Sequence, residues 1–181
     1  MARGPALSRR TGVWRQLDVA ARQAFPGFML LLGLFLIGIP LGLPGQAALR
    51  PAYMLSCVFF WTLYRPGALP LPFTAFAGLL TDLAGLTPLG LWAVLLLVLQ
   101  FVTTLLRPHL AAARFTRVWA VFAGMAACAC ALEWIAGSVL ALRAMPVGPA
   151  FAEIALACAL YPALAALLIR AHRSAAAAEH V

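Results

Sequence analysis

The chain has 181 residues, of which 65% are hydrophobic and only 10% are charged, whereas an average soluble domain carries roughly 25% charged residues. This composition excludes an ordinary soluble domain and favours an all-α integral membrane protein, because long apolar segments recur along the chain. The net charge of +8 does not indicate nucleic-acid binding, since the thirteen basic residues are arginines at the ends of apolar segments rather than a basic patch with interleaved aromatics.

The N-terminal segment, residues 1–23, carries five arginines ahead of the first apolar segment. Trp14, Leu17 and Ala21 have the i, i+3, i+7 spacing of one helix face, which predicts a short basic amphipathic helix on an anionic membrane surface. A disordered basic tail is the alternative. The helical alternative implies contact with membrane lipids.

Six apolar segments follow and predict six transmembrane helices. They lie at residues 25–43, 52–64, 69–86, 89–106, 118–142 and 149–169. Together they predict one membrane domain over residues 24–170, followed by a short tail at 171–181. The second segment is short, because the stretch between Arg50 and Arg65 spans about 21 Å as a helix and a hydrocarbon core is about 30 Å thick. We therefore expect this helix to be enclosed by its neighbours, or its flanking arginines to reach for the membrane surface.

The distribution of arginines predicts the orientation of the chain. If both termini are cytoplasmic, eleven of the thirteen arginines fall in cytoplasmic segments, and only Arg50 and Arg143 lie on the outer side. Positive residues are retained on the cytoplasmic side of membrane proteins. The alternation holds through every loop, which favours six spans.

Small residues recur every four positions in the last two apolar segments. The rows are Ala120, Gly124 and Cys128; Ala123, Ala127 and Ala131; and Ala155, Ala159 and Ala163. Small residues allow close approach of helix backbones in lipid. The rows predict packing within the bundle, a docking face for another membrane protein, or both.

Three acidic residues, Asp82, Glu133 and Glu153, fall in the predicted outer half of the membrane, where charge is costly and marks function or a specific pairing. Asp82 precedes a turn with Gly85 and Gly90, and there it can cap free backbone N–H groups. Glu153 lies near a helix start, where an acid suits the helix dipole. The partner of Glu133 stays open between Arg143 and a group on another chain.

No catalytic or metal-binding pattern accompanies these acids. The chain has no Gly-x-Ser-x-Gly, His-Glu-x-x-His or phosphate-binding loop. The four cysteines are interpreted as small packing residues: Cys57, Cys128, Cys130 and Cys158. We therefore expect no cofactor and no enzymatic activity.

One stretch resembles a known family. It contains Trp61-Thr-Leu-Tyr64-Arg65-Pro66, then Gly78-Leu-Leu-Thr-Asp82, then Gly85-Leu-Thr-Pro88-Leu-Gly90. This combination is similar to the rod shape-determining protein MreD, with the departure that Thr81 stands where that family more often has an apolar residue. The signature positions are Tyr64, Arg65, Pro66, Gly78, Asp82, Pro88 and Gly90.

The resemblance implies a non-enzymatic scaffold of the bacterial elongation (Rod) complex, a multi-pass protein of the inner membrane that contacts MreC, with MreB, RodA and penicillin-binding protein 2 as further members. It implies a helix stop at Arg65-Pro66, a close-packing glycine at Gly78 and a fixed turn from Asp82 to Gly90. The implied fold resembles the S-components of energy-coupling-factor transporters. A small-molecule (vitamin-type) binding subunit of a transporter is therefore the alternative function.

Overall fold

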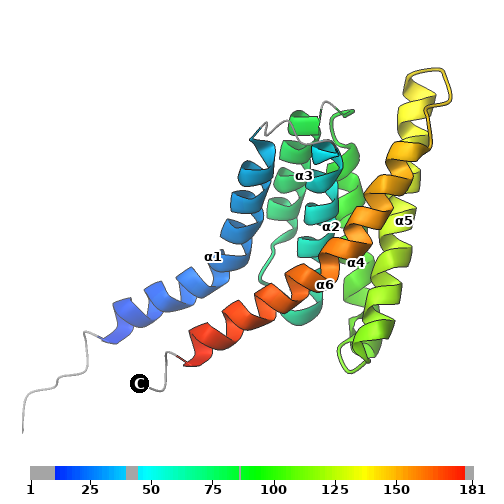
Figure 1. Cartoon of the computed structure of the whole chain (residues 1–181). Helices are drawn as coiled ribbons and strands as arrows, with labels where there is room; N and C mark the ends of the chain where they lie inside the picture. The colour runs from blue at the N-terminus through cyan, green and yellow to red at the C-terminus, as the bar shows by residue number, and fades with distance from the viewer. Residues whose placement is uncertain (1–10, 40–44, 86, 178–181) are drawn as a thin grey trace, which may run out of the picture.

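The protein is a bundle of α-helices (Figure 1). The computed structural model describes residues 11–39, 45–85 and 87–177, and the side chains within 25–39, 45–85 and 87–167. Its helices are α1 (Thr11–Gly38), α2 (Gln46–Tyr64), α3 (Leu71–Gly85), α4 (Leu91–Leu110), α5 (Phe115–Leu140) and α6 (Gly148–Ala177). Since these ranges contain helices and no strand, the predicted all-α class is confirmed.

The second helix, α2, forms the centre of the bundle. It packs against all of the other helices, and twelve of its 19 residues are buried. The short segment is therefore enclosed by its neighbours, which was the first of the two alternatives expected for it. Its predicted start was wrong, because the helix begins at Gln46 and contains Arg50 and Pro51. The half-buried Arg50 guanidinium donates a hydrogen bond to the carbonyl oxygen of Ala84 in α3, which keeps it inside the bundle.

The last two helices pack through different rows than the sequence indicated. In α5 the buried residues include Val118, Phe122, Ala126 and Cys130, and in α6 they are Glu153, Ala157, Tyr161 and Ala165. The predicted rows Ala120–Gly124–Cys128 and Ala155–Ala159–Ala163 are exposed, and Ala123–Ala127–Ala131 is only partly covered. Packing within the bundle is therefore wrong for the Ala120 and Ala155 rows, because the buried rows are shifted from them by two residues, which is about 200° around a helix. The docking-face alternative stays a prediction.

An aromatic cluster ties α5 and α6 to the central helix. The ring of Tyr161 stacks on Phe122 at a centroid distance of 4.4 Å, and Phe59 of α2 meets Tyr161 edge-on at 5.5 Å. All three side chains are fully buried. Aromatic pairs of this kind contribute about 0.5–1.5 kcal/mol beyond their burial, so this cluster anchors the outlying pair of helices.

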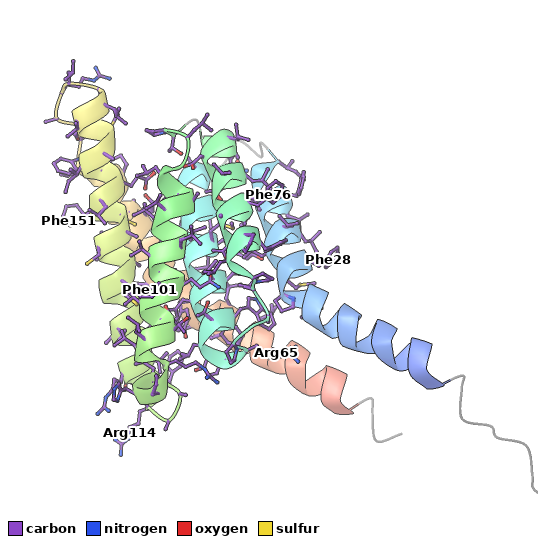
Figure 2. The ribbon with its side chains drawn as sticks, turned by 180° about the vertical axis from the view of Figure 1, so that it is seen from behind. Phe28, Arg65, Phe76, Phe101, Arg114 and Phe151 are labelled. Atoms are coloured by element: carbon purple, nitrogen blue, oxygen red, sulfur yellow. The ribbon has the colours of Figure 1, made fainter. Side chains whose placement is uncertain are left out.

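Three helices are long and apolar enough to cross a membrane: Leu91–Leu110, Phe115–Leu140 and Gly148–Leu167. By contrast, α3 has 15 residues, about 22 Å at 1.5 Å per residue. Figure 2 shows Phe28, Phe76, Phe101 and Phe151 projecting sideways from the bundle, and each of them is more than half exposed. Such an apolar girdle is what lipid contact requires.

The two terminal helices extend beyond the predicted membrane domain. Helix α1 is continuous from Thr11 and crosses the expected boundary at residue 23, so residues 11–23 are helical. Helix α6 continues to Ala177, into the expected tail. Both ends leave the bundle on the same side (Figure 1). The remaining parts of the two predicted tails, 1–10 and 178–181, lie outside the described residues.

Candidate functional site

The acidic residue Asp82, near the end of α3, builds the turn that leads into α4. Its Oδ2 accepts a hydrogen bond from the backbone N–H of Gly90 at 2.9 Å. Its Oδ1 accepts from the backbone N–H of Trp92 at 3.0 Å and from the hydroxyl of Thr87 at 2.9 Å. The carboxylate is fully buried. Because the first N–H groups of a helix have no partner within it, Asp82 caps α4 from outside, which confirms the capping interpretation.

Two glycines make this arrangement possible. A Cβ atom on Gly78 would lie 2.4 Å from Cα of Ala93, so the backbones of α3 and α4 touch at this point. Gly90 has a φ of +94°, a conformation that glycine adopts without steric cost. The expected close-packing role of Gly78 is therefore confirmed, and Pro88 lies exposed between the two helices that Asp82 joins.

The other signature residues lie at the opposite end of α3. Helix α2 ends at Tyr64, and the N–H of Arg65 donates to the carbonyl of Trp61 at 2.8 Å, which confirms the expected helix stop. The Arg107 side chain of α4 donates from Nε to the carbonyl of Leu63 at 3.1 Å, so it satisfies one of the last carbonyls of α2. Figure 2 places Arg65 toward the same end as Arg114. The signature thus divides between both ends of the bundle.

A tryptophan that the sequence did not single out connects the acids. The indole Nε1 of Trp92 donates to Glu133 of α5 at 3.1 Å, while its backbone N–H binds Asp82. Trp92 is almost fully buried, with 1% of its surface exposed. The open partner of Glu133 is therefore Trp92 and not Arg143, which lies on the exposed connection between α5 and α6.

The third acid, Glu153 of α6, lies beside Glu133, and their carboxyl groups are close enough to interact. Glu153 is 8% exposed, and its Oε1 has no hydrogen-bond partner among the residues that the structure describes. It is the sixth residue of α6, beyond the first turn where the helix dipole acts. The dipole interpretation was therefore wrong for Glu153, and its acceptor stays available.

Two adjoining cavities open beside these carboxylates, at the end of the bundle where α5 connects to α6. The larger has a volume of about 660 Å³, and Glu133, Glu153, Trp134 and Met145 are among its lining residues. The smaller, about 170 Å³, is lined by the same two glutamates and by Arg50. Both glutamates therefore line the two cavities, while the oxygens of Asp82 are occupied by the turn.

The cavity wall on the α5–α6 side is held by its own hydrogen bonds. Trp134 donates from Nε1 to the carbonyl of Met145 at 3.0 Å, and the N–H of Met145 donates to the hydroxyl of Ser138 at 3.2 Å. No group of three or more metal-ligating side chains occurs within the described ranges. The larger cavity thus offers a carboxylate oxygen without a donor, Oε1 of Glu153, beside several apolar wall residues.

Comparisons of the chain with protein-family models, with curated proteins and with solved structures found no match.

Proposed function

We propose that this protein is a non-enzymatic scaffold subunit of the bacterial elongation complex, similar to MreD. The observation that supports the proposal is that several signature residues act together in the structure. Gly78, Asp82 and Gly90 form one structural unit that joins α3 to α4. Their pattern therefore reflects a specific helix–turn–helix geometry, which makes a chance resemblance in an apolar sequence a poorer explanation.

The proposal includes a topology with six membrane spans and both termini in the cytoplasm of a bacterium. Beyond the three helices that are long and apolar enough by themselves, α1, α2 and α3 would cross as parts of the bundle, where neighbours shield their polar groups. Arg65 and Arg114 lie toward one end of the bundle (Figure 2), and this end would face the cytoplasm.

The proposed contact face for the single transmembrane helix of MreC lies between α4 and α5. A groove of about 320 Å³ separates these helices, and its lining is apolar. Gly124 and Cys128 line it and are exposed, together with Ala120 on the same row of α5. Since a partner helix in lipid gains its stability from close van der Waals packing, exposed small residues beside a groove suit such a helix.

The test is a pull-down of the tagged protein from native membranes, with the associated proteins identified. We expect MreC to be recovered with the wild type and lost with Gly124→Leu. Gly38→Leu is the matched control, because both glycines have open space where a side chain would go and Gly38 lies on α1. Equal recovery of MreC with both variants would exclude the α4–α5 groove as the contact face. The loop between these helices would then be tested by changing three arginines to Glu: Arg107, Arg114 and Arg117.

The second candidate is a small-molecule binding subunit of a transporter. The cavity of about 660 Å³ with the unpartnered Glu153 favours it, since ligand sites usually occupy about 300–1,000 Å³ and carry few polar groups. In the same pull-down this function would recover transporter ATPases and no wall-synthesis proteins. Recovery of MreC, RodA or penicillin-binding protein 2 would exclude it as the main role.

A further inference from the structure

We propose that the larger cavity, at the α5–α6 end, binds one monovalent organic cation, meaning a protonated amine or a guanidinium group. This group can be a free small molecule or a basic side chain of a partner protein. The inference does not rest on the scaffold role, because it depends only on the residues around Glu133 and Glu153.

Among the described residues, no basic side chain forms an ion pair with Glu133 or Glu153. Glu133 and Glu153 lie side by side and both line the two cavities. Arg50 lines the smaller cavity, but its guanidinium donates to the carbonyl oxygen of Ala84. Asp82 has both oxygens occupied by donors from its own turn. Arg143 lines the larger cavity, but its side chain is exposed to solvent, which screens its charge.

The unpartnered atom shows which kind of group is missing. Oε1 of Glu153 is an acceptor without a donor, although more than nine-tenths of the residue is buried. Buried polar atoms in folded proteins nearly always have a partner, and an exception calls for a ligand, an ion or a water. The indole Nε1 of Trp92 is already used by Glu133, and that of Trp134 by the carbonyl of Met145. A donor must therefore enter from the cavity.

The walls select an organic cation rather than a bare metal ion. Leu91, Met145 and Pro149 make much of the cavity wall apolar, and the volume of about 660 Å³ exceeds what one ion fills. Trp134 also lines the cavity, and its hydrogen bond to Met145 fixes the indole. An aromatic ring beside a carboxylate stabilises ammonium and guanidinium groups through cation–π attraction. Metal sites need several converging ligands, and the described part of the chain has no cluster of three.

The experiment titrates n-butylammonium into the purified protein in lipid nanodiscs and follows tryptophan fluorescence, with n-butanol as the neutral probe of similar shape. We expect saturable binding of n-butylammonium, none of n-butanol, and at least a tenfold loss of affinity in Glu153→Gln. Glu133→Gln keeps an acceptor for Trp92 and should lose affinity as well. Asp18→Asn removes a carboxylate from the N-terminal half of α1, at the opposite end of the bundle (Figure 1), and should bind like the wild type.

Equal binding of the two probes, or unchanged affinity in both glutamine variants, would overturn the proposal. A thermal midpoint close to that of the wild type shows that each variant is folded. The source of the cation follows from repeating the titration on the protein purified together with its native partner. Loss of probe binding there identifies a basic side chain of the partner, and unchanged binding identifies a free small molecule. A failed pull-down would refute the scaffold role and leave the probe titration unaffected.

Discussion

Two acidic residues near the same end of the bundle have opposite surroundings. Asp82, at the α3–α4 turn, accepts three hydrogen bonds, and Glu153, at the α5–α6 cavity, has an oxygen with no donor. Both are buried. The difference arises because the first turn of a helix presents free N–H groups, and α4 directs those groups at Asp82. Glu153 lies inside a helix whose N–H groups are already bonded, so its donor must come from elsewhere.

The comparison separates a carboxylate that holds the fold from one that is available to a ligand. Trp92 connects the two regions, since its backbone serves Asp82 and its indole serves Glu133. If this distinction is correct, substitutions around Asp82 should destabilise the protein and substitutions at Glu153 should not.

The largest effect is expected for Asp82→Ala. The substitution leaves two backbone N–H groups and the Thr87 hydroxyl without an acceptor, and each unpaired buried group costs about 1–3 kcal/mol. We expect a loss of about 4 kcal/mol in the free energy of unfolding, measured by denaturant titration in micelles. A loss below about 1 kcal/mol would show that water replaces the carboxylate and that the turn is not a structural unit.

The next effect is expected for Gly78→Val. The added side chain would overlap the backbone of Ala93, and inserting atoms into a tightly packed contact costs about 1–3 kcal/mol. Gly124→Val is the matched control, because nothing lies within 4 Å of a Cβ atom placed there. The thermal midpoint should fall for Gly78→Val and stay near the wild type for Gly124→Val. Similar midpoints for the two variants would contradict the close approach of α3 and α4.

A smaller effect is expected for Trp92→Phe. This variant keeps an aromatic ring and the backbone bond to Asp82 but removes the indole donor to Glu133. Losing a hydrogen bond to a charged group costs about 1.5–3 kcal/mol, and we expect a value near the lower limit because Glu133 is only half buried. Trp134→Phe is the control, since its bond to Met145 is exposed. Unfolding of both variants in micelles measures the difference.

The smallest effect is expected for Glu153→Gln. The amide removes a buried charge that lacks a donor, so the free energy of unfolding should stay the same or rise by about 1 kcal/mol. Asp82→Asn makes the same chemical change where every oxygen is occupied, and it should destabilise by about 2 kcal/mol. Equal destabilisation by the two amides would mean that Glu153 also has a structural partner and would remove the basis of the comparison.

Some elements of the site follow from short-range rules, and these were predictable. The Asp82 cap is one of these, since its donors lie within ten positions of Asp82. The stop at Arg65-Pro66 and the close-packing glycine Gly78 were expected from the family resemblance, and the structure contains both. Trp92 was missed because its indole meets Glu133 across 41 positions, a separation that no local pattern encodes. Its place directly after the Gly90 turn was the available signal.

Composition and hydrophobic segments alone were enough to predict a membrane protein, its all-α class and the approximate positions of six helices. Tertiary structure decided which faces are buried, because alanine is so frequent in α5 and α6 that rows of small residues exist on opposite faces. The tertiary structure also decided which carboxylate has hydrogen-bond donors for both of its oxygens. Hydrophobicity and helix periodicity act within a segment, whereas the pairing of a buried charge depends on which helices come to lie beside it.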